Sequence, residues 1–595
     1  MLDYLTFVSL RSHFAKTNLI SLSLLQLADF VCKLQDAGVK LCVLFRQKNH
    51  KKIDKNNSIL LLYFLQYVII PPYKYENFLE VPMKMLTKML SLILAILMCT
   101  GIFAACSDAS TEVSDNASSD NASNTVSKEE GFSYGPVDYG EFPYKNENYE
   151  GSDAIRILCV ETDRHKYGVQ QFSYIEELEG NAINNAVQNR NNFLEETYGI
   201  TFDVTPVKYP SDEMKALITS NTDEYDLVCE SVDRLVSGIS NNYYWSLNDY
   251  IDISHPWWDQ RAINALSLGE KFYFLAGDAL LTDDDNTYLT LFNKDMYSKN
   301  AELTKHGDIY DIVRNGEFTI DLYYEMCRAV SSPDSNGQWG FNATYGNLSH
   351  AYGATVMMNG LNIATVTKDA SNKLNITLDD EASINAFNKV YELMSDNTNT
   401  QRAELIAGQS TTNPSQYGFA ELEEMFVNER GLFYNTTSSS VSILKSADVE
   451  FEFGVLPIPK LNKDQDYYCN TVNVYQSSAF AIPSSVPTSR IPQIAFALQA
   501  MGFYNADVIR AYYQTTLQLQ AVQSDDDAEM LDIVYNNRFY DIGAIYNWGG
   551  KLLGLYGSII GNSNSNTLVS TWQGIESTVQ TAMDQAVDAY NNATT

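Results

Sequence analysis

Two Asp-Arg pairs stand out as side chains that could bind a polar ligand. Asp163 and Arg164 form the first pair, and Asp233 and Arg234 form the second. Each pair follows an apolar run of strand length after two or three intervening residues. Carboxylates and guanidinium groups are planar hydrogen-bonding groups that suit a ligand rich in hydroxyl groups. The pairs therefore direct attention to the elements that must hold them in place.

Strands and helices are predicted to alternate around these pairs. Strand, helix, strand, helix, strand predicts right-handed βαβ units and a parallel sheet, and hence an α/β fold. Gly199 is well placed to end the first helix. In such a sheet ligands gather at the carboxyl ends of the strands, here the loops 161–166 and 230–237. The expected elements are Ala154–Val160, Asn181–Tyr198, Ile200–Val207, Asp212–Thr219 and Tyr225–Cys229.

The part of the chain after residue 150 is longer than one hydrophobic core usually supports, so two lobes are expected. Its C-terminal half has apolar residues at helical spacing in six stretches. These stretches are Glu381–Met394, Gly418–Asn428, Ser489–Phe503, Asp507–Gln518, Asp525–Tyr535 and Leu568–Tyr590.

Signatures of catalysis and metal binding are missing from the sequence. It has no glycine-rich phosphate loop, no HExxH and no GxSxG. The acidic run 282–286 lacks the spacing of a calcium loop, and we expect it to be solvated or at the edge of a cleft. Cys159, Cys229, Cys327 and Cys469 show no CxxC and no clustering with histidine, and are too sparse for a disulfide scaffold. These absences favour a protein without a metal or a cofactor.

A segment near residue 100 has the composition of a secretory signal peptide. Two lysines precede the apolar run Met89–Phe103, which is too short to span a bilayer comfortably. Residues 103–106, Phe-Ala-Ala-Cys, resemble the bacterial lipobox, in which the cysteine is lipidated. The resemblance implies a lipoprotein signal peptide over 83–105, lipidation of Cys106 and a lipid anchor on the extracytoplasmic face of the cell membrane.

The segments on either side of this signal have contrasting compositions. Residues 106–150 are rich in Ser, Asn, Asp and Glu and are predicted to form a disordered tether. Residues 1–82 are interpreted as an upstream extension that is not in the mature protein, and the alternative is a membrane-associated N-terminal extension. Residues 1–105 carry a net charge of +6 and the remainder carries −40. The acidic body argues against nucleic acid and anionic lipid as partners.

A series of short motifs in the body resembles extracellular solute-binding proteins of carbohydrate ABC importers, the family 1 type that includes maltodextrin-binding proteins. The motifs occur in order over about 154–585. They include Trp245-Ser246-Leu247-Asn248-Asp249-Tyr250-Ile251-Asp252, Pro256-Trp257-Trp258-Asp259, Leu291-Phe292-Asn293-Lys294-Asp295-Met296-Tyr297, Phe318-Thr319-Ile320-Asp321, Gly454-Val455-Leu456-Pro457-Ile458-Pro459 and Ser478-Ala479-Phe480-Ala481-Ile482-Pro483.

The resemblance implies a two-lobe periplasmic-binding-protein-like fold of type II, with mixed and parallel sheets flanked by helices and a hinge between the lobes. Lobe 1 would comprise 151–290 and 457–503, and lobe 2 would comprise 291–456 and 504–595. The resemblance also implies a binding protein that is not an enzyme and has no catalytic residue. The implied partners are a carbohydrate ligand, ABC permease subunits and, through them, an ATPase.

Sugars are bound by aromatic rings that stack on their apolar faces and by planar polar groups that pair with hydroxyls. The resemblance implies sugar contacts at both Asp-Arg pairs and a stacking role for Tyr345, in the loop after Phe341. Other candidates are Tyr434 and Asn435, at the end of a strand, and Tyr546 and Trp548, in a loop bounded by Gly543 and Gly549. Local packing is the favoured role for Trp257, Trp258 and Trp572.

Two other functions remain open at this stage. A lipid-anchored glycoside hydrolase would need two carboxyl groups about 5–10 Å apart, and acidic residues are plentiful. A surface sugar sensor or adhesin would share the same fold. The ligand could also be a peptide or a polyol instead of a sugar.

Overall fold

The computed structural model describes residues 139–592, apart from 270, 447–448, 519–523 and 563–564. These residues fall within the second of the chain's two units, Ser127–Thr595. The predicted signal peptide, Cys106, the extension 1–82 and most of the tether lie outside the described residues.

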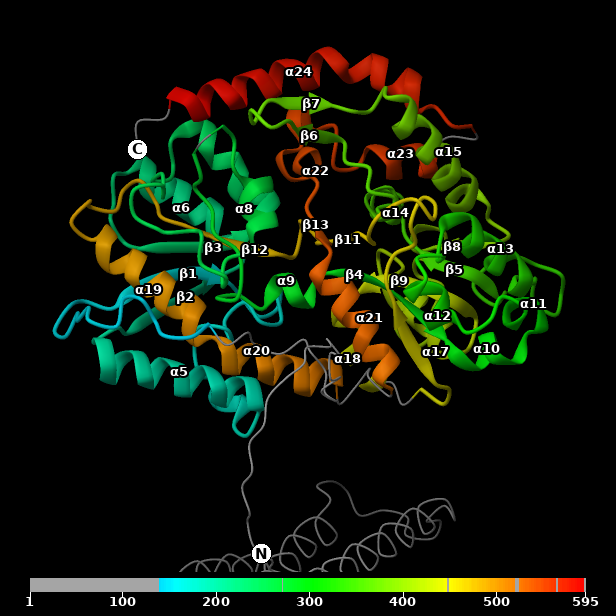
Figure 1. Cartoon of the computed structure of the whole chain (residues 1–595), viewed down its shortest axis with the longest axis horizontal. Helices are drawn as coiled ribbons and strands as arrows, with labels where there is room; N and C mark the ends of the chain where they lie inside the picture. Colours follow the sequence, from blue (N-terminus) through cyan, green and yellow to red (C-terminus); the bar gives the residue numbers. More distant parts are fainter. Residues whose placement is uncertain (1–138, 270, 447–448, 519–523, 563–564, 593–595) are drawn as a thin grey trace, which may run out of the picture. The chain divides into compact units, whose positions relative to one another are not determined.

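A four-stranded sheet has the strand order β12-β3-β1-β2 (Figure 1). Strand β1 is parallel to both β2 and β3, and β12 joins the edge of β3 in the antiparallel sense. The parallel βαβ arrangement predicted from the alternating pattern is confirmed. The strands are β1 (Ile155–Val160), β2 (Phe202–Val207), β3 (Leu227–Ser231) and β12 (Ser478–Ala481).

Helix α5 (Ala182–Tyr198) shows how the local sequence sets an element's limits. Asn181 caps its start by accepting a hydrogen bond from the backbone N–H of Asn184. Gly199 ends it in the left-handed conformation, with φ of 71°, as predicted. A Cβ atom at this glycine would lie 2.4 Å from the backbone nitrogen of Glu150, so no other residue fits without movement.

A five-stranded sheet has the order β10-β4-β9-β5-β8. Strand β4 is antiparallel to β9 and β10, whereas β5 is parallel to β9 and β8. The α/β class with two mixed sheets is thus confirmed. The strands are β4 (Tyr288–Asn293), β5 (Tyr345–Ser349), β8 (Thr400–Arg402), β9 (Gly431–Thr437) and β10 (Phe453–Leu456).

Helices cover both sheets, and two small strand pairs complete the described part. Strands β6 (Val366–Lys368) and β7 (Leu374–Ile376) pair with each other, as do β11 (Asn470–Thr471) and β13 (Arg538–Phe539). Besides α5, the helices between residues 139 and 360 are η2 (Glu176–Leu178), α6 (Pro210–Thr219), α7 (Val232–Leu235), η3 (Val236–Asn241), α8 (Gln260–Leu266), α9 (Thr282–Asp285), α10 (Lys294–Lys299), α11 (Ala301–Thr304), α12 (Ile309–Arg314), α13 (Ile320–Val330) and α14 (Gly353–Gly360).

The six helical stretches predicted for the C-terminal half are confirmed within a few residues at their ends. They correspond to α15 (Glu381–Ser395), α17 (Phe419–Val427), α19 (Ile491–Tyr504), α20 (Ala506–Tyr512) with the π-helical η4 (Tyr513–Gln518), α21 (Asp525–Asn536) and α24 (Leu568–Asn592). The other helices of this half are α16 (Ala403–Ile406), α18 (Ser439–Ser446), α22 (Ile542–Tyr546), η5 (Trp548–Gly550) and α23 (Leu555–Asn562).

Alternation along the strands divides the core. On β1, Ile157 and Cys159 pack with α19 residues in one cluster, whereas Leu158 faces a second cluster. On β4, Leu289 and Leu291 belong to a third cluster that includes residues of α17 and α20. Because side chains alternate between the faces of a strand, each sheet buries apolar residues on both sides.

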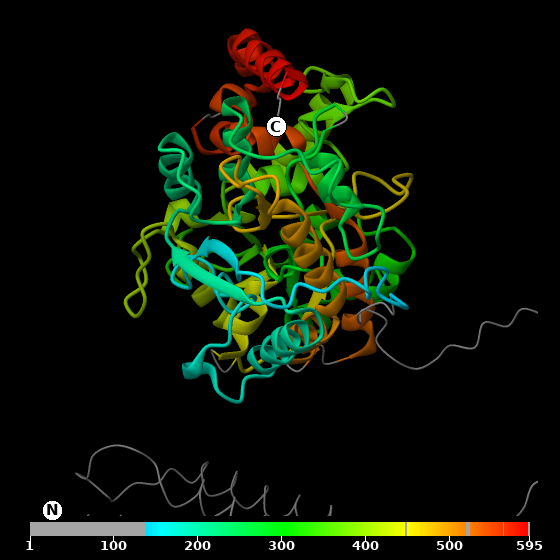
Figure 2. The same cartoon turned by 90° about the vertical axis from the view of Figure 1, so that its left-hand side faces the viewer.

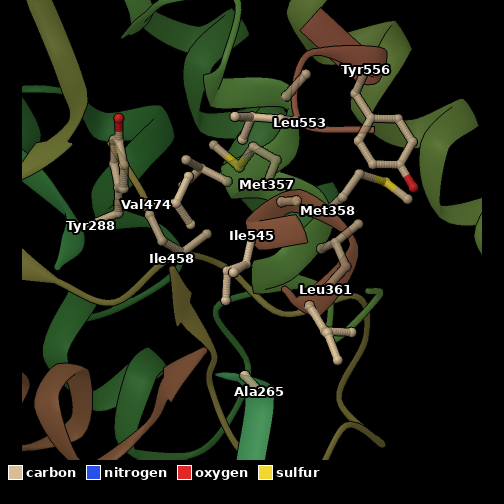
Figure 3. Packing of buried hydrophobic residues seen from close by; sticks show 14 of the residues in the cluster. Ala265, Tyr288, Met357, Met358, Leu361, Ile458, Val474, Ile545, Leu553 and Tyr556 are labelled. Atoms are coloured by element: carbon tan, nitrogen blue, oxygen red, sulfur yellow. The ribbon is translucent and has the colours of Figure 1, made fainter. Parts of the chain in front are cut away.

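The second cluster reaches from one sheet to the other. It contains Leu158 of the four-stranded sheet and Phe292 of the five-stranded sheet. Figure 3 shows part of it, where Ile545 of α22 and Tyr556 of α23 pack near Met357 and Met358 of α14. The two sheets are therefore joined by a shared apolar core as well as by the chain itself.

The C-terminal helices contact elements beside both sheets. Helix α20 packs against α5, and Arg190 of α5 donates a hydrogen bond to the side chain of Asn505. Helix α24 contacts η3, η5 and α15. In both views α24 and α5 lie at opposite ends of the described part (Figures 1 and 2).

Four cysteines lie within the described residues, and all are buried and free. Cys159 and Cys229 are register partners on the parallel strands β1 and β3. Burial raises the pKa of the Cys159 thiol to about 12 and raises that of Cys229 as well. Among the described residues, no helix has the length and apolar character needed to cross a membrane.

Candidate ligand-binding cleft

A cavity of about 360 Å³ opens between the two sheets. Its wall is built from the loop after β1, the segment from α9 to β4, the end of β9 with α18, the start of α17 and the loop before β12. The lining residues are Arg164, His165, Lys166, Tyr167, Thr282, Asp285, Asn286, Tyr288, His350, Phe419, Glu423, Tyr434, Asn435, Thr436, Thr437, Ser439, Ser440, Asn473 and Gln476.

Arg164 reaches the cavity from the carboxyl end of β1 and is held by the end of β3. Its Nη1 lies 2.6 Å from Oε1 of Glu230, whose side chain is fully buried. Its Nη2 donates to Oγ of Ser231 at 2.9 Å, and Nη1 also donates to the carbonyl of Lys208 at 3.1 Å. The guanidinium is therefore fixed by groups that belong to two strand ends.

Arg234, from the second predicted pair, lies near the same carboxyl group as Arg164, that of Glu230. Nε of Arg234 lies 3.5 Å from Oε2 of Glu230, and its Nη2 donates to Asp212 at 2.8 Å. Both guanidinium groups also lie over the ring of Tyr209, Arg164 at 5.1 Å and Arg234 at 4.3 Å from its centre. The fold thus brings the two Asp-Arg pairs together, although only Arg164 lines the cavity.

The aspartates of these pairs stand outside the cavity wall. Asp163 is exposed in the turn after β1. Asp233 is half-buried in the first turn of α7, and burial raises the pKa of its carboxyl. Their proposed contact with a ligand stays a prediction.

Tyr434 and Asn435 line the cavity from β9, in the strand predicted for them. The amide of Asn435 is already engaged, because its Nδ2 donates to Oγ1 of Thr290 at 2.9 Å and its Oδ1 accepts from Tyr323 at 3.4 Å. Tyr434 is therefore the better candidate of this pair for contact with a ligand. Burial raises the pKa of its hydroxyl.

The remaining aromatic candidates lie away from this wall. Tyr345 is the first residue of β5 and not a loop residue, and its buried ring packs 5.4 Å from that of Trp339. The predicted loop 543–549 is only partly a loop: Tyr546 ends helix α22, and Trp548 lies in a turn between the left-handed residues Asn547 and Gly549. Their rings stack at 5.2 Å with an angle of 8°, and Trp548 is 4% exposed within the shared core.

The predicted packing roles of three tryptophans agree with their burial. Trp257 and Trp258 both donate their indole N–H to Oε1 of Gln499 on α19, at 2.8 and 2.9 Å. Trp572 is buried on α24. None of the three lines the cavity.

The acidic run was expected to be solvated or at a cleft edge, and the solvated alternative is wrong. Asp283, Asp284 and Asp285 are buried in the short helix α9, and only Asp285 lines the cavity. Arg538 of β13 lies 3.2 Å from Asp283 and pairs with Asp284. Burial raises the pKa of both carboxyl groups and the guanidinium opposes the rise. Within the described residues no group of His, Cys, Asp and Glu could hold a metal ion.

The sequence did not single out several of the lining residues. His165, Tyr167 and Lys166 lie in or next to the predicted loop 161–166, so their position at a strand end was a usable signal. Phe419 and Glu423 belong to a predicted helix, and 46% of the Phe419 side chain is exposed. An apolar residue on the exposed face of a helix was the available sign of a site there.

The charges on the cavity wall are few. Burial lowers the pKa of both His165 and His350 to about 4, so both rings are neutral at pH 7. Burial raises the pKa of Asp285 to about 6, although Lys166 acts in the opposite direction. Burial also raises the pKa of Glu423 to about 7. Aromatic rings and hydrogen-bonding groups make up most of the rest, an arrangement suited to a small polar ligand.

Two mixed α/β sheets with a cavity between them match the α/β class with mixed sheets that was predicted. The chain is similar to several solved structures of sugar- and solute-binding proteins. A cyclo/maltodextrin-binding protein in complex with maltotetraose is 14% identical, with 75% of this chain and 98% of that chain covered and a TM-score of 0.45.

Two further structures are similar at the same level. UgpB from Mycobacterium tuberculosis, in complex with glycerophosphocholine, is 13% identical over 73% of this chain and 100% of that chain, with a TM-score of 0.47. The sugar-binding protein MalE from Xanthomonas citri is 10% identical over 74% of this chain and 100% of that chain, with a TM-score of 0.48. The sequence matches no protein-family model and no curated protein.

Proposed function

We propose that this protein is a lipid-anchored, extracytoplasmic solute-binding protein that captures a sugar or short oligosaccharide between two lobes and delivers it to an ABC permease. The observation that carries the proposal is the cavity whose wall comes from both sheets. A ligand seated there would contact Arg164 on one side and Tyr434 on the other.

The chemistry of the wall supports a hydroxylated ligand. Tyr167, Tyr288, Tyr434 and Phe419 supply aromatic rings, and threonine, serine and asparagine side chains supply donors and acceptors. A volume of about 360 Å³ is at the low end of small-molecule pockets, which favours a ligand of one or two sugar rings.

Closure of two lobes would couple binding to transport. The proposed lobes are 151–290 with 457–503, and 291–456 with 504–595. The connections near β4, after β10 and at Asn505 are the candidate hinge segments, since a few backbone torsions there can move whole lobes. A ligand that contacts both lobes shifts the equilibrium toward the closed form by its greater affinity for that form.

Anchoring rests on the signal segment and Cys106, which lie outside the described residues. A lipid at this cysteine and the tether that follows it would hold the body close to the membrane, within reach of a permease.

The test is a thermal-shift and calorimetric screen of the purified full chain in detergent against mono-, di- and oligosaccharides. A ligand at one hundred times its Kd stabilises a protein by about 2.7 kcal/mol. The proposal expects one class of saccharide to raise the melting temperature, and Phe419→Ala to reduce that rise. The proposal fails if no saccharide in the panel binds.

The same samples test the hydrolase alternative, because Asp285 and Glu423 are two carboxyl groups on one cavity wall. Chromatography of the bound glycan distinguishes the two functions. An intact glycan supports the binding protein, whereas cleavage products support a hydrolase.

A further inference from the structure

One carboxyl group on the cavity wall lacks a counter-charge. Glu230 forms an ion pair with Arg164 at 2.6 Å. The positive charge of Lys166 opposes the rise in the pKa of Asp285, and the Lys166 ammonium also lies 4.9 Å from the centre of the Tyr167 ring. Among the described residues, Glu423 has no hydrogen bond and no ion pair. The wall therefore presents one uncompensated carboxylate.

The surroundings of Glu423 make this carboxylate attractive to a cation. Its side chain is half-buried on α17, and its charge acts on the nearby hydroxyl of Tyr434. The rings of Phe419 and His350, 5.2 Å apart in an edge-to-face contact, form the adjoining wall. A carboxylate partly withdrawn from water costs free energy unless it is paired, and aromatic faces attract cations.

The two histidines do not supply the missing charge. His165 is buried beside Arg164, and His350 is buried with its Nε2 within 3.2 Å of the Tyr288 hydroxyl. Both environments disfavour an imidazolium ion. Within the part of the chain that the structure describes, Glu423 therefore has no positive partner.

We propose that the ligand of this cavity carries a primary amine, as in an amino sugar, and that its ammonium group pairs with the Glu423 carboxylate. The inference rests on the proposed function and narrows its substrate class. Sugars of the same shape with a hydroxyl or an acetamide in place of the amine leave the carboxylate without a cation and bind more weakly. Acidic sugars are repelled by the same group.

The test is isothermal titration calorimetry of the full chain at pH 7.5 with sugars that differ at one position. The probes are glucosamine, glucose and N-acetylglucosamine, together with their 1,4-linked dimers in the α and β forms. The wild type is expected to bind an amine-bearing member at least tenfold more tightly than its hydroxyl counterpart. Glu423→Gln is expected to erase that preference.

Glu392→Gln is the matched control, because Glu392 is exposed on α15 and does not line the cavity. It should keep the wild-type preference. The inference is overturned if the hydroxyl or acetamide sugars bind as tightly as the amine, or if Glu423→Gln keeps the preference, and in either case sugar capture stands. If none of the sugars binds, the inference and the carbohydrate assignment both fail.

Discussion

The guanidinium of Arg164 and the carboxyl of Glu230 form an ion pair of 2.6 Å between the loop after β1 and the end of β3. Glu230 is fully buried and Arg164 is mostly buried, so the pair lies where water screens it little. The pair orients a cavity residue by fastening it to the strand next to its own.

Removal of this guanidinium should destabilise the fold. Arg164→Met leaves the Glu230 carboxylate buried without its closest cation, a change that costs about 3–5 kcal/mol for buried pairs. The free energy of unfolding at pH 7.5, from urea denaturation, measures the loss.

Two variants control this experiment. Arg164→Met combined with Glu230→Met removes both charges and should recover part of the lost stability. Asp163→Asn removes an exposed charge from the same turn and should change stability by less than about 0.5 kcal/mol. Equal losses in Arg164→Met and Asp163→Asn would contradict the role assigned to the pair.

The carboxyl groups around Arg538 should make stability depend on pH. Burial raises the pKa of Asp278 to about 6, from an ordinary value of 3.8, and also raises the pKa of Asp283 and Asp284. A carboxyl with a raised pKa favours the folded state when protonated, so its contribution is lost as pH rises from about 4 to about 6. Stability measured by denaturation should therefore be greater near pH 5 than at pH 8.

Arg538→Met should strengthen this dependence. The variant leaves Asp283 and Asp284 without the cation that opposes the rise in their pKa. At pH 8 the expected loss is about 3–5 kcal/mol, and it should shrink toward pH 5 as the carboxyls take up protons. Arg510→Met, at an exposed pair with Asp507, should show no such dependence, and an equal loss at both pH values would refute the cluster's role.

Two aromatic side chains should separate binding from stability. Phe419→Ala removes a ring that is 46% exposed on the cavity wall, so it should weaken ligand binding about tenfold with little change in stability. Trp548→Ala opens a cavity in the shared core and should cost about 3–5 kcal/mol. Calorimetry and urea denaturation of both variants measure the two effects. If Trp548→Ala weakens ligand binding while the free energy of unfolding stays unchanged, Trp548 contacts the ligand after all.

The lipid anchor is tested in cells. Cys106→Ala should move the protein from the membrane fraction to the soluble extracytoplasmic fraction and abolish incorporation of labelled palmitate. If the variant stays in the membrane fraction, lipidation of Cys106 is not the anchor, and the membrane-associated extension 1–82 is the alternative.

The strands and helices could be predicted because their signals are local. The apolar run of β1 and the glycine that ends α5, Gly199, lie within or next to the elements that they specify. The predicted loop 543–549 was wrong at its start because a local signal was misinterpreted. Asp541 caps α22 by accepting a hydrogen bond from the N–H of Gly543 at 3.0 Å, so a glycine expected to bound a loop lies in the first turn of a helix.

The cavity could be predicted only in part because distant segments build it. Arg164, Tyr434 and Asn435 were named from strand ends, where the position in a sheet directs a side chain toward the ligand edge. Glu423 carries no such mark, since its place on the wall depends on how α17 packs on β9. The acidic run was expected to be solvated or at a cleft edge, and its burial could not be predicted because the cation beside Asp284, Arg538, is 254 residues away in the sequence.

The register of β1 against β3 places two thiols side by side in the middle of the four-stranded sheet. Cys159 and Cys229 are 0% and 1% exposed. Alkylating reagents react with the thiolate form of cysteine. Neither position can react until the sheet opens and lets in water and base. The rate at which these two cysteines are alkylated, followed by mass spectrometry, therefore measures how often that sheet opens in the wild-type chain.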